Sequence, residues 1–560
     1  MHHAPATGST DDESDELLRG GWRLEDAAHP VECGYEVVRA PAGPLPQLST
    51  HGSDDGHSEK EVGQSLQFHR ESAERRVATI RTLSRLATTN LDRRHYTRRV
   101  GSAKPIRPRY ASIVAEHIAR DRTSVELFAG GGGLAMGVER AGFRPLLFNE
   151  FAKYACETLR ANIAKRRKAD ETHDPSTGDE APLVIPAPGD DIPLVEGDVQ
   201  GLDMAYLNGR VDVLAGGPPC QPFSLGGVAK GDEDKRNMFP QMFRAVRQMQ
   251  PKAVICENVR GLLRPSFKPY FDYILRELEF PFVERVPGSS WQEHDEALKA
   301  AKERGDVAAD KRYDVVMTPV NAADYGVPQI RNRIIIVAFR ADLAVDLDTF
   351  RKMLTPQYSE AALFRSILNG EYWERHKKVP KHVRDRVTAG IPKNIPLDNG
   401  TKPWRTLRDA IEGIDVEGIK LPPLPPISWK KLDRVDYDPD GLRYHVGWPG
   451  ARIYAGHTPN EYDRPAKTVK AGVHGVPGGE SVMLTDDREP DPQSPTGFRY
   501  KHRYMTVRET ARVMTFPDKW QLAGPRGEQM RQLGNAVPVL LGEVFAKAVA
   551  SALDDAESRA

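Results

Sequence analysis

The sequence predicts an α/β fold in which short apolar strands end in glycine-rich or acidic loops. Three observations support this fold class: several short apolar runs, helical patterns after some of them, and glycines or carboxylates directly after the runs. We expect strands at residues 123–128, 144–148, 194–199, 211–215, 253–256 and 334–339. Open α/β folds bind ligands beyond the carboxyl ends of their strands. We therefore expect the functional residues in the loops that follow these strands.

Length and composition narrow the class of protein. The chain has 560 residues, enough for two or three domains, and 39% of them are hydrophobic. No run approaches the ~20 apolar residues that a membrane span needs, and the first residues lack the pattern of a secretory signal. The four cysteines lie far apart, without metal-ligand or disulfide spacing. We expect a cytoplasmic protein with reduced cysteines that binds no metal and does not associate with a membrane.

Charge is balanced overall but uneven along the chain. There are 79 basic and 79 acidic residues, so nucleic-acid binding would have to rest on a local excess. Residues 1–72 are acidic and polar and are predicted to be a disordered tail. Residues 73–120 are predicted to form a basic helical extension, because Glu74 to Tyr110 contain 11 basic and 2 acidic residues. This extension is either a solvated helix or a clamp on nucleic-acid phosphates.

A glycine-rich turn follows the first expected strand. Gly130 to Gly133 precede an expected helix at residues 134–141, and glycines let a ligand approach the backbone at a helix N-terminus. Glu150 ends the second strand 20 residues after Gly130, where a carboxylate binds a ribose diol, and Asp198 ends the third strand. The pattern fits an adenosine-bearing ligand, a nicotinamide dinucleotide included, and does not choose among them.

A cysteine lies at the tip of the loop after the fourth expected strand. The loop Gly216–Ser224 reads Gly-Gly-Pro-Pro-Cys-Gln-Pro-Phe-Ser, and its prolines restrict the backbone around Cys220. Most free cysteines are small buried core residues, so a cysteine alone does not indicate a nucleophile. The loop as a whole closely resembles the catalytic loop of the DNA (cytosine-C5) methyltransferases.

Further motifs resemble the same family and occur in its order. They are Phe128–Gly133, Glu257-Asn258-Val259, Gln329-x-Arg331-x-Arg333, Arg503–Asp518 and Gln532–Pro538. The resemblance implies a Rossmann-like, S-adenosylmethionine-dependent methyltransferase fold with a smaller irregular target-recognition domain. We therefore expect a catalytic domain made of residues 121–340 and 501–560, with target recognition at residues 341–500.

The resemblance also implies roles for individual residues. Glu150 would bind the ribose hydroxyls of S-adenosylmethionine, Phe151 and Val199 the adenine face, and Asp198 the adenine edge. The other residues expected at the methyl donor are Phe128, Gly130, Gly132, Pro218 and Asn535. The expected catalytic residues are Cys220 as nucleophile, Glu257 as the acid that binds the base, and Arg331 and Arg333, which position the base and the acid. Side chains along a strand point alternately to its two faces, so a strand here would carry Gln329, Arg331 and Arg333 on one face.

Residues 341–493 are rich in proline and aromatic residues and have little periodicity, which predicts loops and short strands. Within them, Tyr462–Lys470 and Ala471–Gly479 combine cations with glycines. These segments either contact DNA backbone and base edges or form an ordinary irregular surface.

The resemblance implies an enzyme, a DNA (cytosine-5-)-methyltransferase that flips a cytosine out of double-stranded DNA and methylates it. We expect a monomer at the nucleoid, with a cognate restriction endonuclease or another phage-defence protein as a possible partner. Two alternatives stay open. One is the same chemistry on transfer RNA, and the other is a DNA-binding protein that keeps the fold without turnover.

Overall fold

The computed structural model describes residues 121–167, 184–219, 237–397, 400–413, 421–429, 432, 442–453, 457–471 and 481–560. The predicted tail and basic extension, residues 220–236 with Cys220, and the segment Gly472–Gly479 lie outside these residues.

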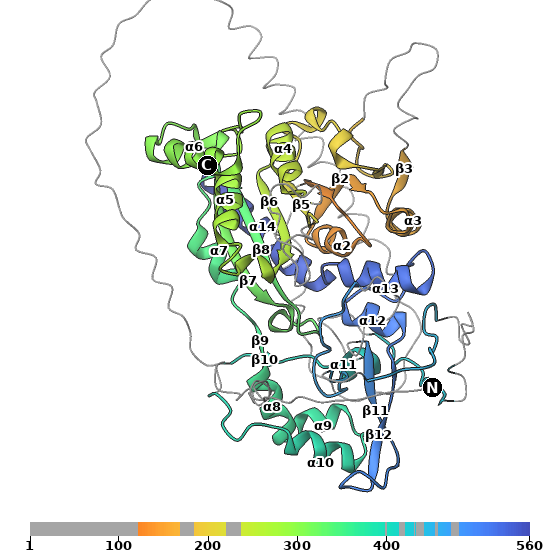
Figure 1. Ribbon diagram of the computed structural model, residues 1–560. Coiled ribbons are helices and arrows are strands. Elements are labelled where there is room, and N and C mark those ends of the chain that lie inside the picture. The colour runs from red at the N-terminus through yellow and green to blue at the C-terminus, as the bar shows by residue number, and fades with distance from the viewer. Residues whose placement is uncertain are drawn as a thin grey trace, which may run out of the picture. The chain divides into compact units, whose positions relative to one another are not determined.

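An eight-stranded mixed sheet organises the described part of the chain (Figure 1). Its strand order is β3-β4-β2-β1-β5-β6-β8-β7, and β8 runs antiparallel to both of its neighbours. The strands are β1 (Arg122–Leu127), β2 (Phe143–Glu150), β3 (Lys165–Arg167), β4 (Pro193–Glu196), β5 (Val213–Gly216), β6 (Ala253–Val259), β7 (Tyr313–Asn321) and β8 (Asn332–Arg340). All six expected strands are present, so the predicted α/β fold class is confirmed.

The order of the strands marks where a ligand binds. The chain passes from β1 outward to β2 on one side, and from β5 outward to β6 on the other. Neighbouring loops therefore leave β1 and β5 in opposite directions, which opens a crevice at the carboxyl ends of these two strands. The glycine-rich turn follows β1 and the cysteine loop follows β5.

Helices cover both faces of the sheet (Figure 1). They are α2 (Gly133–Arg140), α3 (Lys153–Asn162), α4 (Phe239–Met249), α5 (Lys268–Glu279), α6 (Trp291–Arg304) and α14 (Val539–Arg559). Two further helices, α12 (Val507–Val513) and α13 (Arg526–Asn535), pack against each other. Along β6, Val254 and Cys256 pack in the core with α4 and α5, whereas Ala253 and Ile255 pack in the core with α14. This is the alternation of a strand that is buried on both faces. Cys256 is a core residue, as predicted.

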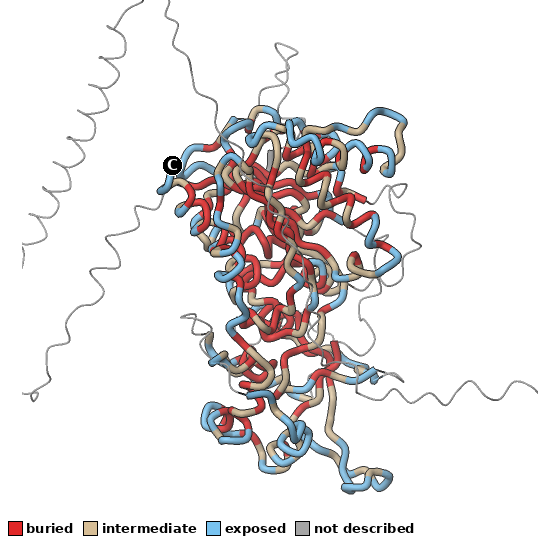
Figure 2. The backbone as a smooth tube through the Cα atoms, turned by 90° about the vertical axis from the view of Figure 1, so that its left-hand side faces the viewer, coloured by how far each residue is buried: buried red, intermediate tan, exposed pale blue. Residues whose placement is uncertain are grey.

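The C-terminal helix α14 returns to the sheet and packs against α2. The two helices approach very closely: a Cβ built on Gly137 of α2 would lie 2.6 Å from the backbone nitrogen of Glu543. Residues Arg526–Arg559 would be long and apolar enough to cross a membrane, but 72% of their most apolar window is buried inside the protein. Figure 2 shows that buried residues gather in the centre of the described part of the chain. The segment is thus packed as a core helix.

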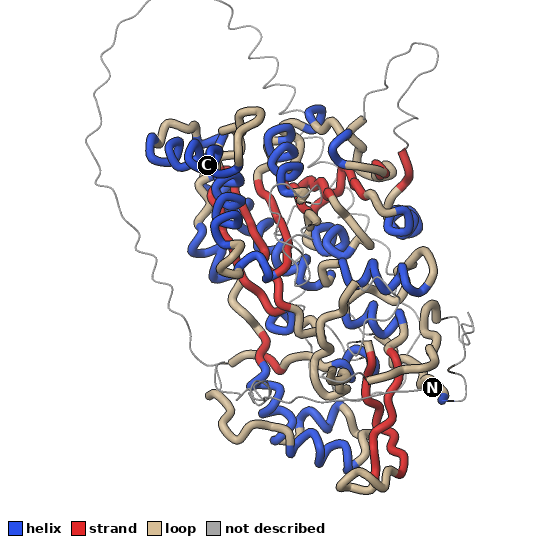
Figure 3. The backbone as a smooth tube through the Cα atoms, in the orientation of Figure 1, coloured by secondary structure: helices blue, strands red, loops and turns tan. Residues whose placement is uncertain are grey.

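Residues 341–504 contain more helix than the sequence predicts (Figure 3). Five short helices lie between residues 347 and 412, where only loops and short strands are expected. They are α7 (Leu347–Met353), α8 (Glu360–Leu368), α9 (Glu371–Arg375), α10 (Lys381–Ala389) and α11 (Leu407–Glu412). The strands of this region are β9 (Tyr358–Ser359), β10 (Lys402–Pro403), β11 (Val482–Pro490) and β12 (Phe498–Tyr504). The prediction of loops was wrong here because these helices are too short to show a clear period in sequence.

Candidate active site

The glycine-rich turn after β1 adopts backbone angles that favour glycine. Phe128, Gly130 and Gly132 have φ values of 58°, 55° and 83°, in the left-handed region where only glycine is unstrained. Gly132 caps the N-terminus of α2. The turn therefore places the free N–H groups of the first helical turn at the carboxyl edge of the sheet.

Glu150 holds this turn in place at the end of β2. Its two carboxylate oxygens accept hydrogen bonds from the backbone N–H of Gly130, at 2.6 Å, and of Ala152, at 2.7 Å. Burial raises the pKa of Glu150 above the usual glutamate value, and these backbone donors partly offset the shift. The side chain is thus a fixed, mostly buried acceptor directly beside the glycine turn.

A second buried acid, Glu126, lies on β1 beneath the same turn. Its carboxyl accepts a backbone hydrogen bond from Ala135, while its Oε2 is buried without a hydrogen-bond partner among the described residues. Burial raises its pKa well above the usual value, and the neighbouring charge of Glu150 adds to the shift. Glu126 was not predicted from the sequence, because a single acid inside an apolar run carries no signal of its own.

The other residues expected at the methyl donor differ in exposure. The ring of Phe151 is 77% exposed, and Asp198 is exposed and caps a short turn through Gln200. Val199 and Pro218 are buried, and Asn535 is exposed at the end of α13. An exposed aromatic ring next to a buried carboxylate and an open glycine turn fits an adenosine-bearing ligand. No group of three or more metal-ligating side chains occurs among the described residues.

The C-terminal part of the chain supports the glycine turn from behind. The indole N–H of Trp520 donates a hydrogen bond to the carbonyl of Gly131 at 3.2 Å. A Cβ built on Gly132 would lie 2.8 Å from the Trp520 ring, and one on Gly131 would lie 3.4 Å from Cβ of Gln532. Trp520 is only 5% exposed. The contact joins residues far apart in the chain, so the sequence offered no signal for it.

Glu257 and Arg333 meet at the carboxyl end of β6. Nε of Arg333 lies 2.9 Å from Oε1 of Glu257, and both side chains are largely buried. The two groups form an ion pair but are not aligned as a hydrogen bond, and Oε1 has no hydrogen-bond partner among the described residues. Oε2 lies 3.8 Å from the position of a Cβ on Gly217, in the loop that leads to Cys220. Cys220 itself lies outside the described residues.

The buried guanidinium of Arg331 binds backbone carbonyl groups. Its guanidinium donates to the backbone carbonyls of Val469, Gly534 and Ala536 at 3.0–3.1 Å, and burial lowers its pKa to about 9. Strand β8 begins only at Asn332, so the prediction of one strand face shared by Gln329, Arg331 and Arg333 was wrong. A turn that is hydrogen-bonded to Ala466 precedes β8, and the two arginines have different partners: Arg331 binds Val469, whereas Arg333 pairs with Glu257.

Asn258 is a positioning residue that the sequence analysis did not single out. Its side-chain amide donates to the carbonyl of Pro218 at 3.1 Å, and its Oδ1 accepts from the backbone N–H of Val259. The amide thereby ties the end of β6 to the Pro218-Pro219 segment just before Cys220. The signal was present in the sequence, since Asn258 directly follows Glu257 in the same motif.

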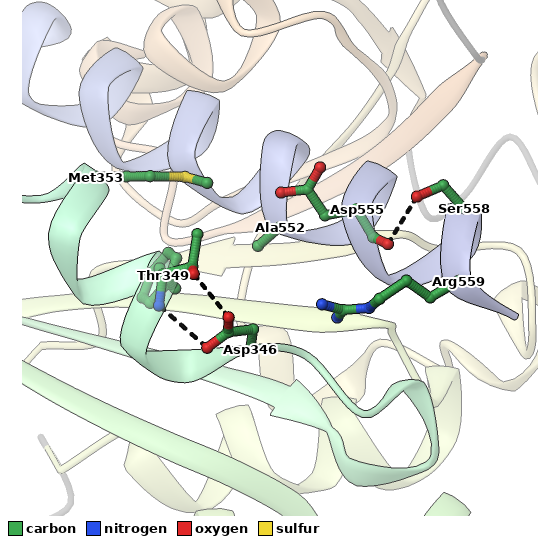
Figure 4. Close-up of a pocket in the computed structure, with 8 residues that line it drawn as sticks. Asp346, Thr349, Met353, Ala552, Asp555, Ser558 and Arg559 are labelled. Carbon is green, nitrogen blue, oxygen red and sulfur yellow. Dashed lines mark hydrogen bonds between the residues drawn. The ribbon is translucent and has the colours of Figure 1, made fainter.

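A capping box begins α12, with the side chains of Thr506 and Glu509 each accepting from the other's backbone N–H. A cavity of about 250 Å³ opens elsewhere, between α7 and the end of α14 (Figure 4). Among its lining residues, Asp346 accepts hydrogen bonds from Thr349, and Ser558 donates to Asp555. It contains none of the predicted site residues, so the crevice at β1 and β5 remains the candidate site.

Comparison with known families identifies this arrangement. The family model of the C-5 cytosine-specific DNA methylases matches residues 122–281 and 282–551. The chain is a C-5 cytosine-specific DNA methylase. The assignment to the DNA (cytosine-5)-methyltransferases, an enzyme class, is thereby confirmed, and so is the methyltransferase fold.

Individual relatives of this methylase are type II enzymes. The type II methyltransferase M.PspPI of Psychrobacter sp. is 29% identical over 445 residues, which cover 78% of this chain and 81% of the relative. The type II methyltransferase M.Eco47II of Escherichia coli is 29% identical over 450 residues, with the same coverage. Among solved structures, the Dnmt2 methyltransferase of S. pombe aligns with a TM-score of 0.40 and 14% identity, over 78% of this chain and 99% of that one.

Proposed function

We propose that this methylase transfers a methyl group from S-adenosylmethionine to C5 of a flipped cytosine in double-stranded DNA, through a transient bond between Cys220 and C6. The observation that carries the proposal is the Glu257–Arg333 pair. A buried carboxylate with an unsatisfied oxygen lies beside a cation, directly next to the loop that leads to Cys220.

The chemistry requires a nucleophile because C5 of cytosine is too electron-poor to attack a methyl group directly. Addition of the Cys220 thiolate to C6 forms a carbon–sulfur bond and makes C5 nucleophilic. S-adenosylmethionine supplies an electrophilic methyl group when bound. A base then removes the C5 proton, the bond from sulfur to C6 breaks, and the thiolate is released.

Glu257 would bind the ring nitrogen N3 and the amino group of the cytosine. Its Oε1 lies 2.9 Å from Nε of Arg333, whereas its Oε2 lies 3.8 Å from the position of a Cβ on Gly217, so Oε2 is the oxygen on the side of the loop that leads to Cys220 and would meet the base. Arg333 holds the carboxylate in position and adds positive charge where electron density accumulates during addition. Arg331 would act indirectly, by fixing the turn from which Arg333 emerges.

The crevice beside β1 and β2 would hold the methyl donor. Glu150 would accept from the ribose hydroxyls, because its oxygens are fixed by Gly130 and Ala152. The exposed ring of Phe151 would cover the adenine, and Asp198 its edge. Phe128, Gly130, Gly132, Pro218, Val199 and Asn535 complete the expected set.

The similarity to type II methyltransferases supports a role in restriction–modification or another phage defence, in the cytoplasm and on chromosomal DNA. A cognate restriction endonuclease is the proposed partner.

Bisulfite sequencing of DNA from cells that express the chain tests both activity and target. We expect one protected sequence context with the wild type and none with Cys220→Ala. The proposal is contradicted if the wild type leaves no cytosines protected from conversion, or if the variant protects them equally. Methylation of transfer RNA alone would mean that the substrate is transfer RNA and not DNA.

A further inference from the structure

We propose that Asn237 and Tyr270 are positioning residues for the nucleophile, and that they act through the backbone next to Cys220. The backbone N–H of Met238 donates a hydrogen bond to the carbonyl of Pro219 at 3.3 Å. Pro219 directly precedes Cys220, and Met238 directly precedes helix α4. This hydrogen bond therefore ties the start of α4 to the residue before the nucleophile. The two roles rest on the proposed function, in which Cys220 adds to the cytosine.

The side-chain amide of Asn237 fixes the position of Met238. Asn237 is only 8% exposed. Its Oδ1 accepts a hydrogen bond from the backbone N–H of Phe239 at 3.3 Å, and its Nδ2 donates to the hydroxyl of Tyr270 at 2.5 Å. The two contacts use both ends of the amide, which gives it a single orientation. Met238 lies between the two residues that this turn joins, so its N–H is held where it meets Pro219.

Tyr270 is a firm anchor for this amide. The side chain lies on α5 and is 6% exposed. Its ring packs edge-on against Trp291 of α6, with 5.3 Å between the ring centres, and lies 5.5 Å from the ring of Tyr273. Neighbours on two sides leave a ring in a close-packed core little room to move. The hydroxyl is thus held in place, and because a buried hydroxyl needs a polar partner, its bond to Asn237 also stabilises the fold.

A second amide holds the same stretch of backbone from β6. Nδ2 of Asn258 donates to the carbonyl of Pro218 at 3.1 Å, so the two consecutive carbonyls before Cys220 are bound by different elements. A nucleophile has to lie about 3–3.5 Å from the carbon that it attacks, in the correct direction. Two anchors on adjacent residues restrict the approach of Cys220 more than one does. We expect loss of one anchor to slow addition to the base and to leave the protein folded.

Tyr273 supplies a matched control on the same helix. Its hydroxyl lies 3.1 Å from Nδ1 of His294, and its ring belongs to the same aromatic group as Tyr270. Tyr270→Phe and Tyr273→Phe each delete one oxygen and keep the ring, so both should destabilise the protein to a similar extent. Only the first deletion breaks the contact with Asn237. A difference between the two variants in the rate of addition therefore reports positioning and not stability.

Covalent trapping by DNA that contains 5-fluorocytosine measures addition directly. The probe is a duplex synthesised with 5-fluorocytosine at every cytosine, so the target sequence need not be known. Fluorine at C5 takes the place of the proton that is removed after methylation, so the bond between sulfur and C6 persists. The full-length chain is mixed with excess probe and saturating S-adenosylmethionine, and the adduct is followed by its slower migration in denaturing electrophoresis.

Tyr270→Phe should form the adduct about three- to tenfold more slowly than the wild type, the usual loss for one hydrogen bond, whereas Tyr273→Phe should match the wild type. The affinity for S-adenosylmethionine should be unchanged in both variants. Adding Tyr270→Phe to Asn237→Ala should cause no further loss of rate, because both changes remove the same contact. Asn237→Asp should trap faster than Asn237→Ala, since a carboxylate can accept from the N–H of Phe239 and from the hydroxyl of Tyr270.

Equal rates of trapping in Tyr270→Phe and Tyr273→Phe would overturn the positioning role. A further, independent loss of rate when Tyr270→Phe is added to Asn237→Ala would overturn it as well. The comparison of the two tyrosine variants stands even if a variant of Asn237 fails to fold. A wild type that forms no adduct would instead contradict the proposed function, and the positioning role with it, so the wild-type measurement distinguishes the two failures.

Discussion

Arg333 lies diagonally across from Glu257 on two neighbouring antiparallel strands. Arg333 of β8 pairs in register with Val259 of β6, two residues beyond Glu257. Residues two apart on a strand point to the same face, so the strand pairing brings Nε of Arg333 to 2.9 Å from the carboxylate. The pair is thus a product of sheet register, and it gives the clearest test of the proposed site.

Arg333→Gln should lower the rate of methyl transfer by roughly 100-fold, the usual effect of removing one preorganised charge from an active site. Single-turnover transfer from labelled S-adenosylmethionine to DNA measures this rate. Arg340→Gln is the control, because Arg340 lies at the other end of β8 and pairs with Asp342. If Arg333→Gln transfers the methyl group at the same rate as the control, Arg333 does not contribute to catalysis.

Arg331 should matter for stability more than for chemistry. Arg331→Gln cannot donate to all three buried carbonyls of Val469, Gly534 and Ala536, and we expect a loss of roughly 3 kcal/mol in the free energy of unfolding. Urea denaturation measures this change, with Arg499→Gln as reference, because Arg499 is exposed on β12 and pairs with Glu489. If unfolding is unaffected while transfer is lost, Arg331 acts directly on the base instead.

Trp520→Phe should weaken methyl-donor binding without slowing the chemical step. The variant keeps the ring beside Gly132 but removes the N–H that binds the carbonyl of Gly131, so KM for S-adenosylmethionine should rise about two- to tenfold. Trp404→Phe is a matched control, since its indole donates to Asp324 and lines no part of the glycine turn. An equal change of KM in both variants would indicate a general loss of stability.

Glu126 should make the wild type less stable at high pH than Glu126→Gln. In the unfolded chain the acid has an ordinary pKa near 4.5, and burial raises it well above this value in the folded protein. As pH rises between the two values, the unfolded state binds fewer protons than the folded state, so folding becomes less favourable. Glutamine does not titrate and avoids this cost.

The free energy of unfolding of wild type and Glu126→Gln, measured from about pH 4 to about pH 8, tests this reasoning. The difference should be small at the acidic end and grow with pH in favour of the variant. Glu139→Gln, at an exposed position on α2, is the control. A constant difference across the range would mean that Glu126 has the same pKa in the folded and unfolded states, and it would contradict the prediction.

Much of the candidate site was predictable from local sequence. The glycine turn, Glu150 and Glu257 follow apolar runs whose strand character is visible in a few residues, and the order of the motifs identified the family. These features depend on backbone preferences and burial within short segments, which act in the same way in any fold.

Other features depended on contacts between distant segments. Arg331 and Arg333 look equivalent in sequence, yet the turn before β8 sends one to three backbone carbonyls and the other to Glu257. Trp520 reaches the glycine turn only because the C-terminal helices return to the sheet, and the short helices at residues 347–412 are stabilised by packing more than by their own pattern. The sequence by itself thus determined the α/β class, the family and the acids at the strand ends. Tertiary structure decided which side chains meet, because hydrogen bonds and ion pairs form only between groups that packing brings within about 3 Å.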